Sequence, residues 1–293
     1  MHPESEAEES AGGDGAATGG DFTLGWSAQT DVGRFRKNNE DAFLLLAIDS
    51  EGGRYLGKTG QATLGACDFV FAVCDGMGGA LAGEFSSKIA AEKITQLLPR
   101  SFRAAALGLP RGFDDILVDL FGRIHHSIQH LGDAYDECRG MGTTLSLGWF
   151  TPGHLHFCHI GDSRIYYLPR GGELLQLTDD HSHVGWLRRA GRLNEREART
   201  HPGRSSLQQA LGAGNQVIEP QVGRVRLAPG DRFLFCSDGL IEGLWDFRLA
   251  DMLARDPEAA MEPTLGAELV EMAVAASGRD NTTAIVVEAF RQG

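Results

Sequence analysis

The stretch Phe69-Val-Phe-Ala-Val-Cys-Asp-Gly-Met-Gly-Gly-Ala-Leu-Ala-Gly-Glu84 joins a continuously apolar run to an aspartate and a cluster of glycines. Residues 69 to 74 are rich in β-branched and aromatic side chains, which predicts a strand covered on both faces. We expect this strand to stop at Asp75-Gly76. The glycines after it remove side chains from the backbone, so a carbonyl oxygen or a ligand can come close to the carboxylate. By itself, however, an Asp-Gly pair is more often a simple hairpin turn.

Other acidic residues stand at the ends of apolar runs in the same way. Asp238 follows one run and Asp280 precedes another, so antiparallel neighbours would bring both to one edge with Asp75. Three more acidic residues occupy similar positions: Glu40, Asp41 and Asp162. Carboxylates gathered at strand ends repel one another and are stable together only with cations between them. The sequence therefore predicts a site for hard, oxygen-seeking divalent ions.

Periodic patterns along the rest of the chain predict an α+β protein. Apolar residues at helical spacing predict helices over residues 80 to 98, 113 to 131, 241 to 253 and 265 to 276. Apolar or alternating runs predict strands over residues 22 to 26, 42 to 48, 143 to 150, 155 to 160, 164 to 168, 173 to 177, 216 to 227, 231 to 236 and 282 to 288. Pro-Gly and Gly-Gly turns separate the four strands between 143 and 177, so we expect these strands to form one antiparallel meander.

Length and composition limit the class of protein. The chain has 293 residues and is 42% hydrophobic, and no linker interrupts residues 21 to 293, which we expect to form one domain. Residues 1 to 20 are Glu, Gly, Ala and Ser with little to bury, which predicts a disordered tail. The formal net charge of −13 argues against a nucleic-acid partner. No run approaches the roughly 18 apolar residues of a membrane span, and the N-terminus has no leader pattern. We expect a soluble, cytoplasmic monomer with no membrane partner.

Two short motifs suggest other chemistries. Gly52-Gly-Arg-Tyr-Leu-Gly-Lys-Thr59 fits the GxxxxGK[ST] pattern of a nucleotide-binding P-loop. A P-loop must open a helix, but a strand-like run follows here, so a hairpin loop is the better interpretation. Cys158-His-Ile-Gly-Asp-Ser-Arg164 fits the CxxGxxR spacing of a cysteine phosphatase. That loop must wrap an anion and lead into a helix, whereas this one contains Asp162 and leads into a strand. The five cysteines include no CxxC pair and are expected to be reduced core residues.

Residues 179 to 209 form a long polar stretch in which the helix and strand patterns break down. It contains six arginines: Arg188, Arg189, Arg192, Arg196, Arg199 and Arg204. Stretches of this length in a compact domain are usually functional or mobile, and clustered arginines in an acidic protein suggest contact with an anionic partner. The alternative is a solvated helix and turn whose charges pair with Glu195 and Glu197.

A series of short motifs occurs in one order along the chain: Arg36 with Asn39-Glu-Asp41, Asp75-Gly-Met-Gly-Gly, Gly83-Glu84, Met141-Gly-Thr-Thr-Leu, Gly161-Asp-Ser-Arg, Thr178-Asp-Asp-His181, Ala210-Leu-Gly, Cys236-Ser-Asp-Gly and Asp280-Asn. As an ordered set covering the chain from Asp21 onward, they resemble the metal-dependent serine/threonine phosphatases of the PP2C (PPM) family, bacterial type. The resemblance implies a four-layer αββα sandwich, in which two packed antiparallel sheets are flanked by helices. It also implies a mobile flap within about residues 179 to 209.

The same resemblance implies a set of metal ligands and two catalytic side chains. The ligands would be Glu40, Asp75, the Gly76 carbonyl, Asp162, Asp238 and Asp280. Asp75 would bridge two tightly held Mn²⁺ or Mg²⁺ ions, and Asp162 would hold a third, weaker one. Asp41 would orient a metal-bound water and Arg36 would bind the substrate phosphate.

The reaction implied is hydrolysis of phosphoserine and phosphothreonine by direct attack of a metal-bridging hydroxide. Bacterial members usually reverse Hanks-type serine/threonine kinases, so a kinase and its phosphorylated substrates are the implied partners. Met77 departs from the histidine of many eukaryotic members, which protonates the leaving group, so a metal-bound water becomes the candidate proton source. One alternative is a catalytically weak or non-catalytic phosphoprotein reader on the same fold. Such a protein would lack a metal carboxylate, and none is missing here.

Overall fold

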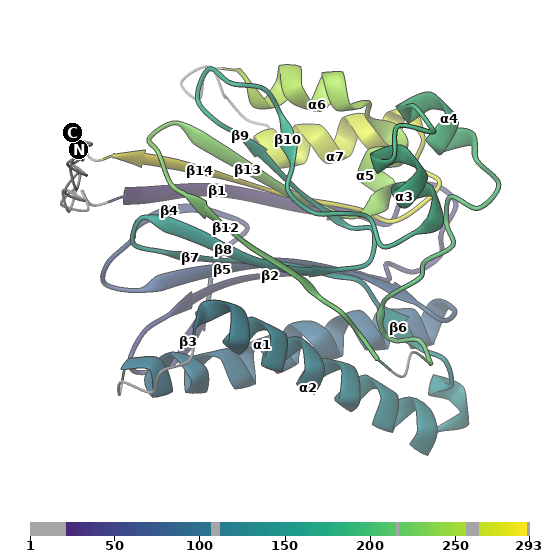
Figure 1. Ribbon diagram of the computed structural model, residues 1–293, viewed down its shortest axis with the longest axis horizontal. Helices are drawn as coiled ribbons and strands as arrows, with labels where there is room; N and C mark the ends of the chain where they lie inside the picture. The colour runs from purple at the N-terminus through teal and green to yellow at the C-terminus, as the bar shows by residue number, and fades with distance from the viewer. Residues whose placement is uncertain (1–21, 107–111, 215–216, 256–263, 292–293) are drawn as a thin grey trace, which may run out of the picture.

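The computed structural model describes residues 22 to 106, 112 to 214, 217 to 255 and 264 to 291. Two antiparallel sheets pack face to face, and helices cover the outer face of each (Figure 1). This arrangement confirms the predicted αββα sandwich. The tail expected over residues 1 to 20 lies outside the described residues.

The first sheet has six strands in the order β10-β9-β13-β14-β1-β4. Their bounds are β10 Leu175–Gln176, β9 Arg164–Leu168, β13 Asp231–Cys236, β14 Thr282–Arg291, β1 Phe22–Asp31 and β4 Thr59–Thr63. β1 pairs with β14 along its whole length, from Phe22 opposite Arg291 to Asp31 opposite Thr282. The two terminal strands of the described chain therefore lie side by side at the centre of this sheet.

The second sheet has eight strands, with the path β11-β6-β5-β7-β8-β12 and with β2 and β3 attached to β5. Their bounds are β11 Leu211–Gly212, β6 Gly142–Thr143, β5 Asp68–Met77, β7 Leu145–Thr151, β8 His154–Ile160, β12 Gln221–Arg226, β2 Asp41–Ile48 and β3 Gly53–Tyr55. The predicted stop of the central strand at Asp75-Gly76 falls one residue short. β5 continues to Met77, because Gly76 and Met77 pair with the short strand β6.

The predicted single meander between residues 143 and 177 was also wrong. β7 and β8 pair with each other in the second sheet, whereas β9 and β10 belong to the first. The chain changes sheets after β8 at Gly161, whose φ of 110° lies in the region that favours glycine. This crossing places Asp162 between the two sheets instead of in a surface turn.

The helices divide between the two outer faces. They are α1 Ala80–Ala106, α2 Phe113–Ala134, α3 His183–Arg189, α4 Glu195–Thr200, α5 Asp238–Gly243, α6 Asp246–Leu253 and α7 Leu265–Ala276, with a short 3₁₀ turn at Asp136–Cys138. α1 and α2 pack on the second sheet, while α5, α6 and α7 pack on the first. The single helix predicted over residues 241 to 253 is two helices, α5 and α6.

The interior between the sheets is rich in aromatic side chains. Phe71 and Phe150 are fully buried there, with ring centroids 5.5 Å apart in an edge-to-face arrangement. The stretch that fits a P-loop contributes β3 and then crosses to the first sheet, and no helix follows it. The P-loop interpretation is therefore excluded. The five cysteines are free thiols. Of the helices within the described ranges, none is both long and apolar enough to cross a bilayer.

Candidate active site

A pocket of about 480 Å³ lies where the ends of the two sheets meet. Its lining includes Arg36 and all six residues predicted to hold metal ions: Glu40, Asp75, Gly76, Asp162, Asp238 and Asp280. Asp41 is not part of the lining and lies buried next to it. The structure therefore brings together residues that are separated by more than 200 positions in the chain.

Both sheets supply carboxylates to this pocket. Asp238 is the first residue of α5, two positions after the end of β13. Asp280 lies two positions before the start of β14, the antiparallel neighbour of β13. Asp75 comes from the second sheet, where it lies opposite Asp41 in the pairing of β5 with β2. The prediction that Asp75, Asp238 and Asp280 meet at one sheet edge is thus correct for two of them. The third reaches them from the facing sheet.

Two glycines make room for the acidic residues. A Cβ atom at Gly76 would lie 2.1 Å from the Gly83 carbonyl oxygen, and a Cβ at Gly83 would lie 2.2 Å from Glu40 Oε2. Real Cβ atoms do not approach other atoms so closely, so any side chain at either position would force the backbones apart. The glycines therefore allow the first turn of α1, the end of β5 and Glu40 to pack in direct contact.

The surroundings of Asp75, Asp162 and Asp238 disfavour the charged forms of these carboxyl groups. Burial raises the pKa values of Asp75 and Asp238 well above the usual range, and the charges of neighbouring aspartates raise them further. Burial and the nearby Asp180 raise the pKa of Asp162 to about 7. In the case of Asp75, the neighbours that contribute are Asp41, Asp238, Asp162 and Asp280. A cation among these groups would reverse the effect, since positive charge stabilises carboxylates.

Two hydroxyl groups hold the Asp41 carboxylate by one of its oxygens. Ser237 Oγ and Thr283 Oγ1 both donate hydrogen bonds to Asp41 Oδ2, at 2.7 and 2.6 Å. Burial nevertheless raises the Asp41 pKa to about 6, because it outweighs these donors. No local sequence pattern predicts this arrangement. Ser237 follows a strand and Thr283 opens another, and only the pairing of β13 with β14 brings their hydroxyls to one carboxylate.

The chemistry of the donor set can be tested against the divalent ions that the resemblance implies. Asp41 Oδ1 and Asp238 Oδ1 are buried and accept no hydrogen bond from any described residue. Buried carboxylate oxygens are costly without a partner, and oxygen-only donors suit Mg²⁺ or Mn²⁺. The residues present therefore fit such ions. Among the described residues, however, no three acidic, histidine or cysteine side chains already close on a single point as ligands of one ion do.

Arg36 lies at the mouth of the pocket with its guanidinium toward the acidic residues. Its Nη2 donates a 2.6 Å hydrogen bond to Asp280 Oδ2, and its Nη1 lies 3.9 Å from Glu40 Oε1. The side chain is 46% exposed, so solvent and solutes can reach it. Arg36 thus points back toward Glu40, four positions further along the chain.

Asn281 fastens the loop that carries Arg36. Its Oδ1 accepts the Glu40 N–H at 2.8 Å, and its Nδ2 donates to the carbonyl oxygens of Val32 and Asn38 at 2.9 and 3.0 Å. The side chain is almost completely buried. Asn281 therefore joins the loop before β2 to the turn that carries Asp280. In the sequence, Asn281 stands out only as part of the Asp280-Asn motif, because contacts across about 240 positions leave no local pattern.

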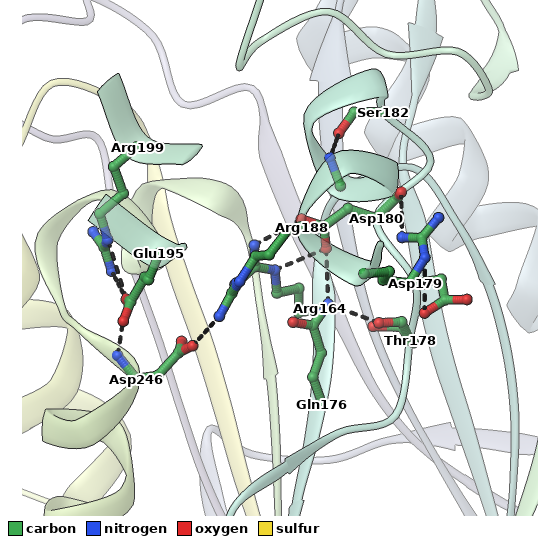
Figure 2. Close-up of polar contacts among 12 residues, drawn as sticks. Arg164, Gln176, Thr178, Asp179, Asp180, Ser182, Arg188, Glu195, Arg199 and Asp246 are labelled. Carbon is green, nitrogen blue, oxygen red and sulfur yellow. Dashed lines mark hydrogen bonds and ion pairs between the residues drawn. The ribbon is translucent and has the colours of Figure 1, made fainter. Parts of the chain in front are cut away.

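The long stretch between residues 179 and 209 folds into α3 and α4, which pack beside α5 and α6 (Figure 1). Figure 2 shows how its charges are used. Arg199 Nη2 lies 2.8 Å from Glu195 Oε1, Arg188 pairs with Asp246, and the buried Arg164 makes a two-pronged contact of 2.8 and 2.7 Å with Asp180. Most of the predicted arginine cluster thus pairs within the chain, which favours the alternative of internally paired charges. The acidic partners include Asp179, Asp246 and Glu242 in addition to Glu195.

Cys158 does not have the setting of a catalytic nucleophile. It is fully buried within β8, and burial raises the pKa of its thiol well above the usual range, so the reactive thiolate is disfavoured. The chain then crosses to β9 and forms no helix whose N-terminus could hold a phosphate. The geometry therefore argues against the cysteine phosphatase.

We expect Cys158→Ser to keep most of the phosphatase activity that the resemblance implies, because a buried serine replaces one small side chain with another and no thiolate takes part. The measurement is manganese-supported phosphate release from a phosphothreonine peptide at 25 °C, with circular dichroism to confirm folding. The wild-type protein treated with iodoacetamide provides a second check and should also remain active. A folded but inactive Cys158→Ser protein would restore the cysteine mechanism.

Two packed antiparallel sheets with a carboxylate-lined pocket at their ends agree with the comparison with protein families. A family model described as Protein phosphatase 2C matches residues 58–272. The chain belongs to this family.

Relatives of known function that are similar to this chain are named as protein phosphatases. Serine/threonine protein phosphatase PstP of Mycobacterium tuberculosis is 34% identical over 270 residues, which cover 91% of this chain and 45% of PstP. Protein phosphatase PhpP of Streptococcus pneumoniae is 33% identical over 262 residues, covering 89% of this chain and 96% of PhpP. The chain thus spans about half the length of PstP and nearly all of PhpP.

Solved structures resemble the chain in the same way. The serine/threonine phosphatase of S. agalactiae superposes with a TM-score of 0.72 at 28% identity, covering 92% of this chain and all of that one. The catalytic domain of PstP in complex with two manganese ions gives a TM-score of 0.68 at 29% identity, covering 92% of this chain and 99% of that one. The solved relatives therefore support the fold.

Proposed function

We propose that this protein is a Mn²⁺- or Mg²⁺-dependent phosphoprotein phosphatase that hydrolyses phosphoserine and phosphothreonine. The observation that carries the proposal is the convergence of five carboxylates and Arg36 in one pocket, with two buried carboxylate oxygens that lack any hydrogen-bond donor among the described residues. Membership of the family and the names of its relatives support the same reaction.

The residues that would hold the ions are those of the pocket. Asp75 would be shared between two ions, with Asp238 and Asp280 serving one and Glu40 and the Gly76 carbonyl the other. Asp162 would hold a third ion more weakly. Two divalent cations bound there would supply a water ionised near neutral pH and would offset charge on the phosphoryl oxygens.

The chain's own residues bind and orient the substrate. The planar guanidinium of Arg36 can donate two hydrogen bonds to a phosphate and so fix the phosphorus in the pocket. Asp41, held on one oxygen by two hydroxyls, presents its free Oδ1 as an acceptor that can orient a water molecule. Met77 lines the pocket and has no dissociable proton, so the leaving group takes its proton from water.

The partners that follow from this activity are phosphorylated proteins. They include a serine/threonine kinase and the proteins that it phosphorylates, from which this enzyme would remove the phosphate. We place the protein in the cytoplasm as a monomer. The relatives named as serine/threonine phosphatases support the substrate class.

Phosphate release from a phosphothreonine peptide, measured with added Mn²⁺ and with EDTA, tests the proposal. We expect turnover with manganese and its loss in the chelator. Full activity of metal-stripped protein in EDTA would contradict the metal mechanism. Tight phosphopeptide binding without any turnover in manganese would favour the non-catalytic reader instead.

A further inference from the structure

A second pocket, of about 530 Å³, adjoins the active-site pocket. The two share Phe35, Asp162, Ser205 and Asp238 in their linings, so they lie side by side. The walls of the second pocket come from α3, α4, the start of α5 and the turn before β14. A peptide whose phosphorylated residue occupies the active site therefore lies next to this second pocket.

Five arginines line the second pocket, and internal partners account for four of them. Arg164 pairs with Asp180, Arg188 with Asp246, Arg199 with Glu195 and Arg204 with Glu242, as Figure 2 shows for the first three. These ion pairs hold the walls in place and cancel the charge of the arginines that make them. They leave little capacity in those four side chains for a ligand.

Arg279 is the fifth arginine of the lining and differs from the others. It is exposed, and it makes no ion pair and no side-chain hydrogen bond with any residue in the described part of the chain. Its backbone is nevertheless fixed. The Arg34 N–H donates to the Gly278 carbonyl oxygen at 2.7 Å, and Asn281 clamps the other side of the same turn. A guanidinium without a partner thus stands on a rigid turn, one residue from Asp280.

We propose that the second pocket receives the substrate residues that flank the phosphorylated one, and that Arg279 selects an anionic side chain among them. This inference rests on the proposed phosphatase function. The guanidinium fork binds a carboxylate and a phosphate with the same geometry, so the anion is either an acidic residue or a second phosphorylated residue. Phe35, 73% exposed at the junction of the two pockets, offers an apolar surface for the intervening residue.

Two acidic residues line both pockets and decide whether an anion can bind there. Asp162 and Asp238 line both pockets and would repel an anion, but both belong to the proposed cation site. Apart from these two, three acidic residues face the five arginines in the lining: Asp180, Glu195 and Glu242. The protein loaded with Mn²⁺ is therefore the form in which Arg279 attracts an anionic side chain.

The test compares kcat/KM for a set of phosphothreonine peptides with manganese-loaded full-length protein. A parent peptide with neutral flanks is compared with peptides carrying Glu, or a second phosphothreonine, at single positions one to four residues to either side. We expect at least one anionic position to raise kcat/KM about five-fold, the scale of one partly exposed charge pair, and to do so less at high salt.

The ratio of kcat/KM between the best anionic peptide and the parent isolates the role of Arg279. Arg279→Ala should bring this ratio to about one, and Arg279→Glu should reverse the preference in favour of a Lys-flanked peptide. Arg34→Ala is the matched control. Arg34 is also an exposed arginine without an ion pair among the described residues, and it lies beside the same turn but outside both pockets. It should leave the ratio unchanged.

The outcomes separate this inference from the function on which it rests. If the wild-type protein cleaves all peptides equally, or if Arg279→Ala keeps the full ratio, the inference is overturned while the phosphatase assignment stands. If no peptide is cleaved, both are overturned. A preference for Glu that equals the preference for phosphothreonine identifies general acidity as the feature recognised. A preference for phosphothreonine alone identifies doubly phosphorylated substrates.

Discussion

Asp75→Asn is expected to lower turnover of a phosphothreonine peptide by roughly 10²- to 10⁴-fold, because several kcal/mol of charge stabilisation depend on the carboxylate that both ions would share. Asp75 is the acidic residue of the site on which most of the others act electrostatically. The amide that replaces it is almost the same size and keeps a neutral oxygen, so the pocket keeps its shape. The measurement is kcat and kcat/KM in saturating Mn²⁺.

The same variant carries its own control for folding. In EDTA the buried carboxylates repel one another without compensation, so removal of the Asp75 charge should raise the melting temperature of the metal-free protein above that of the wild type. The expected combination is a strong loss of activity with an equal or higher melting temperature in chelator. Near-normal turnover of Asp75→Asn would contradict the role of this residue, and a collapsed melting temperature would indicate a structural role instead.

The sequence was sufficient to predict the elements that end in the site. Apolar runs with an acidic residue at one end pointed to Asp75, Asp238 and Asp280, because each run is a buried strand whose register is set by its hydrophobic pattern. The helices over the outer faces followed from their 3.6-residue periodicity, as in α2, whose buried residues repeat at three- and four-residue intervals.

The remaining features depend on which strands are neighbours in space, and local patterns do not contain that information. The extension of β5 to Met77 requires β6 as its partner, and the division of β7 to β10 between two sheets depends on the crossing at Gly161. Likewise, the hydroxyls that hold Asp41 and the amide of Asn281 act across more than 190 positions. The free Arg279 could be recognised only after the partners of the other arginines were known.

Asp68 lies at the opposite end of β5 from the active site, and its burial makes the stability of the protein depend on pH. Asp68 opens β5 and is almost completely buried, and Trp149 Nε1 donates a 2.9 Å hydrogen bond to its Oδ2. It forms no ion pair with any described residue. Burial raises the Asp68 pKa to about 6, although the Trp149 hydrogen bond acts in the opposite direction.

The sign of the effect follows from the direction of this pKa shift. The folded state holds the Asp68 proton up to about pH 6, whereas an unfolded aspartate releases it near pH 4. Asp68 therefore contributes most to the free energy of unfolding below about pH 4. This contribution is lost as the pH rises from about 4 to about 6. The expected penalty at neutral pH is about 2 to 3 kcal/mol.

Asp68→Asn should remove this penalty, because the amide is neutral at all relevant pH values and its oxygen can still accept the Trp149 N–H. The unfolding free energy of the variant minus that of the wild type, from urea titrations, is expected to rise by about 2 to 3 kcal/mol between pH 4 and pH 7.5. Taking the difference cancels the titration of the active-site carboxylates, which both proteins share. Asp251→Asn, at an exposed position of α6, is the matched control and should give a difference that is nearly independent of pH. A flat profile for Asp68→Asn as well would mean that the Asp68 carboxyl is as well solvated in the folded state as in the unfolded one.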